Sequence, residues 1–245
     1  MISPSKYDKL KFIMASNNEF NLDSKEMAEA GINLGHKDSR WHPKIKPYLQ
    51  GTKNGIHLID LEKTKEKLTE ALKFIEELIL NNKVLLLVGT EVQAKDLVKE
   101  VGEECKLPYI NERWLGGTFT NFQTIKKRID YFNSLEKKRE AGEFDRYTKK
   151  ERAKIDEELK RLRVNFEGIR TLEALPDAIL VLSMKKDDLA VKEARERGVK
   201  IIGIADTNVN PELADFPIPG NDGAVTSIQY ILNKVKEVVL SKRTK

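Results

Sequence analysis

Side chains that could bind a polyanion gather in one stretch of the sequence, between residues 35 and 64. Its first half reads GHKDSRWHPKIKPYLQ and surrounds one tryptophan with cationic side chains and histidines, while only one aspartate offsets them. Ammonium and guanidinium groups neutralise phosphates, and an indole ring stacks on a base, so this combination favours RNA as the ligand, with a neighbouring protein as the other partner that would cover the aromatic ring. The residues that we expect to contact RNA in this stretch are Lys37, Arg40, Trp41, His42, Lys44, Lys46, Lys53 and Asn54.

A second basic and aromatic pair follows in the block NERWLGGTFTN, residues 111–121. Arg113 and Trp114 stand just before a pair of glycines, which permits a loop that presents both side chains to a ligand. The next segment opens with three consecutive cations in an otherwise charge-balanced helix. We therefore add Arg113, Trp114, Lys126, Lys127 and Arg128 to the expected RNA-binding set.

Catalytic and metal chemistry fit the sequence less well. The loop that begins at Gly89 has one glycine where a dinucleotide fingerprint needs three, and the chain has no Walker-type phosphate loop. The spacing of His36, His42 and His57 matches no zinc pattern. Asp206, in the sequence Asp-Thr-Asn, is more typical of a turn than of a catalytic acid. We predict no enzymatic activity, no cofactor, no metal and no small-molecule substrate, with a nucleotide-binding α/β enzyme as the alternative.

Short aliphatic runs alternate with amphipathic helices along the chain. Such alternation predicts a doubly wound parallel sheet with helices on both faces, that is, an α/β fold. The strands are expected at 56–60, 84–88, 109–110, 178–182 and 200–205. Helices are expected at 23–31, 61–81, 91–105 and 187–198 and at the end of the chain, where Asp222 could cap the last one. The segment 215–222, rich in proline, is expected to form a loop.

Residues 122–170 differ from the rest because they are long, charged and helical. Ile155, Leu159, Leu162 and Phe166 recur at heptad spacing, and Thr148 with Glu151 forms a capping box, so an antiparallel coiled-coil hairpin is expected here. The predicted organisation is a flexible N-terminal extension at 1–22, an α/β domain formed by 23–121 and 171–245, and the inserted hairpin at 122–170.

The composition sets wider limits. The chain has 245 residues, 40% of them hydrophobic, and 44 Lys+Arg against 39 Asp+Glu give a net charge of +5. This excess is small, so the clustering of the cations carries the argument for RNA rather than their number. The single cysteine excludes an internal disulfide and suits a reducing compartment. No apolar run has the length of a membrane span, and the first twenty residues resemble neither a signal nor a transit peptide, so no membrane partner is expected.

Several blocks of the sequence together resemble one family. They are residues 35–64 (GHKDSRWHPKIKPYLQGTKNGIHLIDLEKT), 114–121 (WLGGTFTN), 176–177 (PD), 204–208 (IADTN) and 216–222 (FPIPGND). Their order and spacing are similar to those of the bacterial and organellar family of ribosomal protein S-two, a protein of the small ribosomal subunit.

This resemblance implies a doubly wound sheet with an inserted coiled-coil hairpin and no enzymatic activity. It also implies a cytoplasmic, ribosomal location, contacts with small-subunit rRNA and neighbouring ribosomal proteins, and support for ribosomal protein S-one, which captures mRNA. An interaction scaffold that works independently of the ribosome through the hairpin remains a second alternative.

Overall fold

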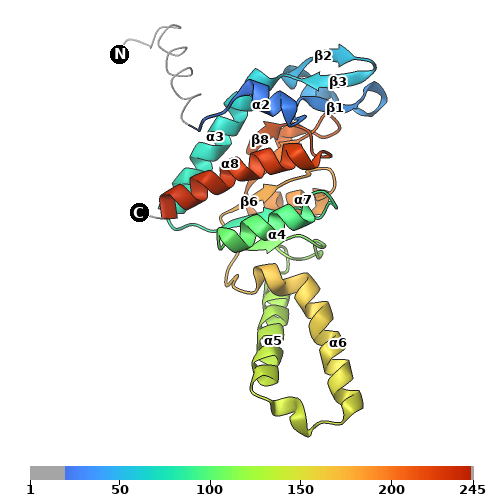
Figure 1. Ribbon diagram of the computed structural model, residues 1–245, viewed down its shortest axis with the longest axis vertical. Helices are drawn as coiled ribbons and strands as arrows, with labels where there is room; N and C mark the ends of the chain where they lie inside the picture. The colour runs from blue at the N-terminus through green and yellow to red at the C-terminus, as the bar shows by residue number, and fades with distance from the viewer. Residues whose placement is uncertain (1–19, 244–245) are drawn as a thin grey trace.

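The centre of the molecule is a parallel sheet with the strand order β5-β4-β6-β7-β8. The computed structural model describes residues 20–243. Its parallel strands are β4 (Leu85–Val88), β5 (Tyr109–Ile110), β6 (Ala178–Val181), β7 (Lys200–Ala205) and β8 (Phe216–Pro219). β4 and β6 each consist of four buried residues, as expected for strands that are covered on both faces. The predicted α/β class is confirmed, with helices on either side of the sheet (Figure 1).

The edge strand β8 replaces one strand that the sequence placed wrongly. Residues 56–60 were expected in the parallel sheet, whereas 215–222 were expected to be a loop. In the structure β8 pairs with β7, and Pro217 and Pro219 lie opposite Gly203 and Ala205. Proline lacks a backbone N–H donor. It is tolerated in an edge strand, because such a strand pairs with a neighbour on one side only and the missing donor can face solvent. The prolines are therefore the reason that β8 was predicted to be a loop.

Residues 34–59 form a separate antiparallel sheet with the order β1-β3-β2. Its strands are β1 (Leu34–Lys37), β2 (Leu49–Lys53) and β3 (Ile56–Ile59), and two 3-10 helices, η1 (Asp38–Arg40) and η2 (Pro43–Tyr48), join β1 to β2. Asn54 and Gly55, with φ of 53° and 73°, form the tight turn between β2 and β3. The stretch expected to be a loop followed by a core strand is thus a small sheet of its own.

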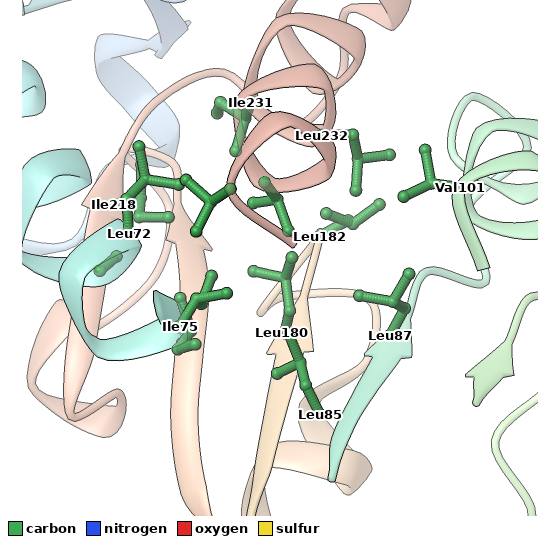
Figure 2. Close-up of a cluster of buried hydrophobic side chains, with 14 of the residues drawn as sticks. Leu72, Ile75, Leu85, Leu87, Val101, Leu180, Leu182, Ile218, Ile231 and Leu232 are labelled. Carbon is green, nitrogen blue, oxygen red and sulfur yellow. The ribbon is translucent and has the colours of Figure 1, made fainter. Parts of the chain in front are cut away.

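Pleating divides the buried side chains of the parallel sheet between two cores. Leu85 and Leu87 belong to one core, and Leu86 and Val88 belong to the other. Helices α3 (Leu61–Leu80), α4 (Lys95–Glu104) and α8 (Val225–Arg243) cover the first face. Figure 2 shows aliphatic side chains of these helices pointing toward those of the strands. Helix α7 (Asp188–Arg197) and the base of the paired helices α5 (Phe122–Glu140) and α6 (Lys149–Phe166) cover the second face.

The ends of the helices follow capping rules, with one exception. The Asp60 carboxylate accepts a hydrogen bond at the start of α3, and Gly198 ends α7 with a φ of 70°. Asp222 does not occupy the cap position that the sequence suggested, because α8 begins at Val225 and the Asp222 carboxylate accepts a hydrogen bond from Ser183 instead. Within residues 20–243 no helix combines the length and the apolar character that a bilayer crossing requires.

Helices α5 (Phe122–Glu140) and α6 (Lys149–Phe166) extend away from the sheet and are joined by the short helix η3 (Glu143–Arg146) (Figure 1). The Thr148–Glu151 capping box is present. Ion pairs join the two helices, Arg139 to Asp156 at 3.1 Å and Arg163 to Glu136 at 2.6 Å. The coiled-coil geometry of this pair and the domain boundaries at 122 and 170 remain predictions from the heptad spacing.

The N-terminal part of the described chain is packed against the body. Residues 1–19 of the expected extension lie outside the described residues. Leu22 was also assigned to that extension, but it is buried in the first core beside Met27 of α2 (Ser24–Glu29). The Asp23 carboxylate caps α2. The folded body therefore begins before residue 23, because the apolar Leu22 side chain is removed from water.

We expect Leu180→Ala to lower the free energy of unfolding by about 2–5 kcal/mol, because Leu180 is fully buried between the sheet and its helices and truncation leaves a cavity. Chemical denaturation followed by circular dichroism measures the change. Val92→Ala is the matched control, since Val92 is 82% exposed and its truncation should change stability by about 0.5 kcal/mol or less. Equal effects of the two substitutions would contradict the packing described here.

Candidate nucleic-acid interface

The small antiparallel sheet displays most of the cations expected to bind RNA. Between β1 and β3 the exposed members of the expected set are Lys37, Arg40, Trp41, Lys44, Lys46, Lys53 and Asn54. His42 is half-buried, and its Nδ1 accepts a hydrogen bond from the Lys44 N–H at the start of η2. Lys44 forms an ion pair with Glu212, which neutralises part of its charge.

The end of β7 holds this basic segment in place. The His42 N–H donates to the Thr207 carbonyl at 2.7 Å, and the His36 N–H donates to Thr207 Oγ1 at 2.8 Å. A Cβ atom at Gly35 would collide with the Thr207 side chain, so only glycine permits the close approach. Ile45, fully buried in the second core, anchors the segment from the other side. The cations therefore stand on a fixed backbone rather than on a mobile loop.

Trp41 is partly available to a ligand. Its side chain is 36% exposed, and its ring packs against His57 with a centroid separation of 5.2 Å and an interplanar angle of 43°. His57 Nε2 lies 2.9 Å from Asp38 Oδ1, which orients the imidazole beneath the indole. The indole thus has a supported face and an exposed portion, the arrangement that a stacking platform for a base requires.

Trp114, in contrast to Trp41, is buried, so the expectation that it contacts RNA at the surface is wrong. Its side chain is only 7% exposed and packs edge-on against Phe119 in the second core. Its indole N–H donates to Glu193 Oε1 at 3.3 Å. Arg113, its neighbour, is exposed. The buried tryptophan therefore shapes the loop and cannot stack on a base.

Glu193 organises the loop that contains Trp114. Its carboxylate also accepts hydrogen bonds from the backbone N–H groups of Gly117, Phe119 and Thr120 at 2.8–3.1 Å. Burial opposes ionisation of Glu193, but these N–H groups outweigh burial and lower its pKa. Glu193 was not among the residues predicted from the sequence to have a role. Its local signal is an acidic residue between Val191 and Ala194, within the apolar stripe of a helix.

The two basic loops lie at the same end of the sheet but not on neighbouring strands. The first is fixed to β7 and the second follows β5, so β6 and β4 separate them. Three strand spacings correspond to roughly 14 Å. Lys127 and Arg128 are exposed on the first turns of α5, and Lys126 pairs with Asp130 at 3.3 Å. The expected set therefore does not form one compact patch.

A polar network lies beneath the first loop. His36 Nδ1 is 3.2 Å from Asp206 Oδ1, and the hydrogen bond between them raises the pKa of His36. Asp206 and Asp222 are both buried, and burial together with the Asp206 charge raises the pKa of Asp222 to about 7. A cavity of about 570 Å³ opens beside this network and is lined by His36, Lys37 and Arg40. The positive charge of the loop thus borders a concave surface.

The crevice where a nucleotide would bind in this kind of sheet is bridged by side chains. The chain order reverses between β4 and β6, which is where α/β enzymes bind nucleotides. There the Thr90 hydroxyl donates to Asp187 Oδ1 at 2.7 Å and the Thr90 N–H donates to Oδ2 at 3.3 Å. Among residues 20–243 no group of three or more His, Cys, Asp and Glu side chains could hold a metal ion. This arrangement gives the nucleotide-enzyme alternative no support.

Comparison with known proteins decides the family. The model of the family described as ribosomal protein S2 matches residues 27–241. The chain belongs to the ribosomal protein S2 family. Members of this family are structural, non-enzymatic proteins of the small ribosomal subunit, so a ribosomal role in translation follows for this chain.

Curated relatives in the ribosomal protein S2 family cover most of the chain. The small ribosomal subunit protein uS2 of Dictyoglomus turgidum is 45% identical over 89% of this chain and 89% of the relative. Protein uS2c of Rhodomonas salina is 45% identical over 87% of this chain and 88% of the relative. Protein uS2 of Thermus thermophilus is 43% identical over 89% of this chain and 86% of the relative.

We expect Glu193→Gln to lower the free energy of unfolding by about 3 kcal/mol or more. The Gly117 and Phe119 N–H groups donate to the two oxygens of the Glu193 carboxylate, whereas the glutamine amide has one oxygen and must place its NH2 group against one of these N–H groups. Each hydrogen bond to a charged group contributes about 1.5–3 kcal/mol, so its loss is costly. Urea denaturation followed by tryptophan fluorescence measures the loss. Glu196→Gln, an exposed acid on the same helix, is the control and should remain within about 0.5 kcal/mol of the wild type. A stable E193Q protein would show that Glu193 does not organise the loop.

The pKa of Asp222 predicts a pH dependence of stability. Between its ordinary value of 3.8 and about 7, folded Asp222 keeps a proton that the unfolded chain releases. The folded state then binds more protons, so this group makes the free energy of unfolding fall as pH rises, by up to about 1.4 kcal/mol per pH unit. The raised pKa of His36 acts in the same direction above pH 6.5.

Asp222→Asn should remove the Asp222 component of this slope, because the amide stays neutral and can still accept the hydrogen bond from Ser183. Unfolding free energies of wild type and variant, measured from pH 4 to pH 8, should therefore diverge across the window. Glu196→Gln should run parallel to the wild type. Parallel curves for D222N and wild type would contradict a proton retained by Asp222 in the folded state.

Proposed function

We propose that the chain binds small-subunit rRNA through the cations and the tryptophan of residues 37–54. The observation that carries the proposal is that hydrogen bonds to Thr207 fix the backbone of the basic segment at the carboxyl end of β7. This segment presents Arg40, Trp41 and Lys46 to solvent together. Cations neutralise phosphates, and the indole covers one base, so the surface matches a folded RNA strand rather than a protein of mixed charge.

The distribution of charge supports RNA as the ligand. Lys37, Arg40, Lys46 and Lys53 are exposed, and none has an ion-pair partner in the part of the chain that the structure describes. Lys44, in the same segment, is paired with Glu212 and is therefore the less available cation. Unpaired cations attract a polyanion without first breaking an ion pair, so Lys37, Arg40, Lys46 and Lys53 are available for phosphate contacts.

Flanking residues extend the proposed interface. Arg113 is exposed in the loop that follows β5, and Lys127 and Arg128 are exposed on the first turns of α5, where Lys126 is half-buried. We retain them as secondary phosphate contacts. Trp114 is removed from the set because it is buried.

Family membership is the basis on which we propose the remaining roles. Within a cytoplasmic small subunit the chain would also contact neighbouring ribosomal proteins and support binding of ribosomal protein S-one. The family match over residues 27–241 supports this part of the proposal. Quantitative mass spectrometry of small subunits tests this part of the proposal, because S-one should be lost from subunits that lack this chain.

Reversing two unpaired cations tests the proposal. Arg40→Glu combined with Lys46→Glu should weaken binding to a small-subunit rRNA transcript. Because each lost phosphate contact reduces the salt dependence, the log–log slope of affinity against salt should become shallower by about 0.7–0.9 per site. Filter binding over a salt series measures both. Trp41→Ala should weaken binding by about 1–3 kcal/mol while leaving the slope unchanged.

The control is Lys83→Glu combined with Lys106→Glu, which changes net charge equally at exposed positions near the amino ends of the strands. It should bind the transcript nearly as well as the wild type. In cells, the Arg40 and Lys46 variant should be depleted from small subunits, and S-one should be depleted with it, as quantitative mass spectrometry can show. Equal transcript affinity for both double variants would contradict the proposed interface.

A further inference from the structure

A groove of about 730 Å³ lies at the opposite end of the sheet, where the parallel strands begin. The residues just before β4, β5 and β6 line it, together with the last turns of α3 and α8. Because the strands are parallel, this end faces away from the carboxyl end that presents the proposed rRNA interface. The groove is therefore separate from the site already described.

The groove has an aliphatic surface that solvent reaches. Leu80 at the end of α3 is 58% exposed, and Val84, just before β4, is 38% exposed. Leu172 and Leu107 are buried at the same groove, and Leu175 is half-buried there. Covering this apolar surface would release about 25 cal/mol for each Å² removed from water. An exposed aliphatic patch with a polar border is typical of an interaction site.

Cations form the border. Lys83, Lys106, Lys242 and Arg243 line the groove, and Glu173 is the one acid among its lining residues. Lys242 pairs with Glu76 at 2.6 Å, and Arg243 donates to the Cys105 carbonyl, so the end of α8 is held beside the groove. Lys83 and Lys106 are exposed and have no ion-pair partner within residues 20–243. The two lysines are available to a negatively charged ligand.

We propose that this groove docks an acidic amphipathic segment of a neighbouring protein. Its apolar side chains would cover Leu80 and Val84, while its carboxylates would face Lys83 and Lys106. RNA matches the groove less well, because the described residues that line it include no aromatic ring on which a base could stack. Phosphates alone would leave the aliphatic surface in contact with water.

Two other occupants lack the complementary charge. Residues 1–19 contain Lys6, Lys9 and Lys11 against Asp8 and Glu19, so they add positive charge to a positive border. A second copy of the chain in a symmetric contact would place the same cations opposite one another. An acidic segment from a different protein satisfies both the apolar surface and the border.

Purified full-length chain and synthetic peptides test this proposal independently of rRNA binding. The probe is a fluorescein-labelled helical peptide with a leucine stripe and glutamates on its other face. A peptide with the same stripe and lysines, and single-stranded oligouridylate, are the comparison probes. Fluorescence anisotropy should show binding of the acidic peptide, weak binding of the basic peptide and no competition by oligouridylate. Tighter binding of the basic peptide, or displacement by oligouridylate, would overturn the proposal.

Variants locate the binding. Lys83→Glu with Lys106→Glu should weaken acidic-peptide binding roughly tenfold, as expected for the loss and reversal of two exposed charge pairs. Leu80→Asp should weaken it at least as much. The matched controls are Arg40→Glu with Lys46→Glu for charge and Leu189→Asp for an exposed leucine elsewhere. Peptide affinity that falls equally in tests and controls, or in neither, would refute the groove as the docking site.

A crosslinking experiment repeats the test inside assembled small subunits. A photo-reactive benzophenone amino acid replaces Leu80 in one strain and Leu189 in another. Mass spectrometry of the Leu80 products should identify a protein segment rich in aspartate and glutamate, absent from the Leu189 products. Crosslinks from position 80 to rRNA, to a basic segment or to nothing would contradict the proposal.

Discussion

The hydrogen bonds between residues 36–42 and Thr207 are the constraint on which the proposed rRNA interface depends. They tie the small antiparallel sheet to the end of β7, and the buried Asp206 supports Thr207 from below. Many long cationic side chains on a mobile loop would lose conformational entropy on binding RNA. Here the backbone is ordered before any ligand arrives, so only the side chains remain to be ordered on binding.

The direction of the parallel strands separates two chemically different ends. At the carboxyl ends, polar side chains and cations follow the strands, and the acids Asp206 and Asp222 are buried beneath them. At the amino ends, Leu80 and Val84 are exposed within a cationic border. The proposed RNA and protein ligands would therefore contact opposite ends of one sheet and would not compete for the same side chains.

Trp41 and Trp114 show how one sequence signal leads to two structures. Each stands beside an arginine in a loop that contains glycine or proline, so the sequence offers no way to tell them apart. Trp41 lies over His57 on a small sheet with a solvent-exposed face, whereas Trp114 faces a core that α7 closes. Glu193 on α7 supplies an acceptor for the Trp114 indole N–H, which makes burial of that ring favourable.

Local pattern in the sequence determined the α/β class, four of the five parallel strands, the helices and the capping box, because buried aliphatic runs and helical periodicity are local properties. The cationic character of residues 37–54 was equally evident from the sequence. Contacts between distant segments place β3 outside the parallel sheet, add β8 to it despite two prolines, and bury Trp114 in the second core, where its indole N–H donates to Glu193. Strand partners and burial depend on segments distant in the sequence, such as Thr207 against His36, and no local spacing encodes those contacts.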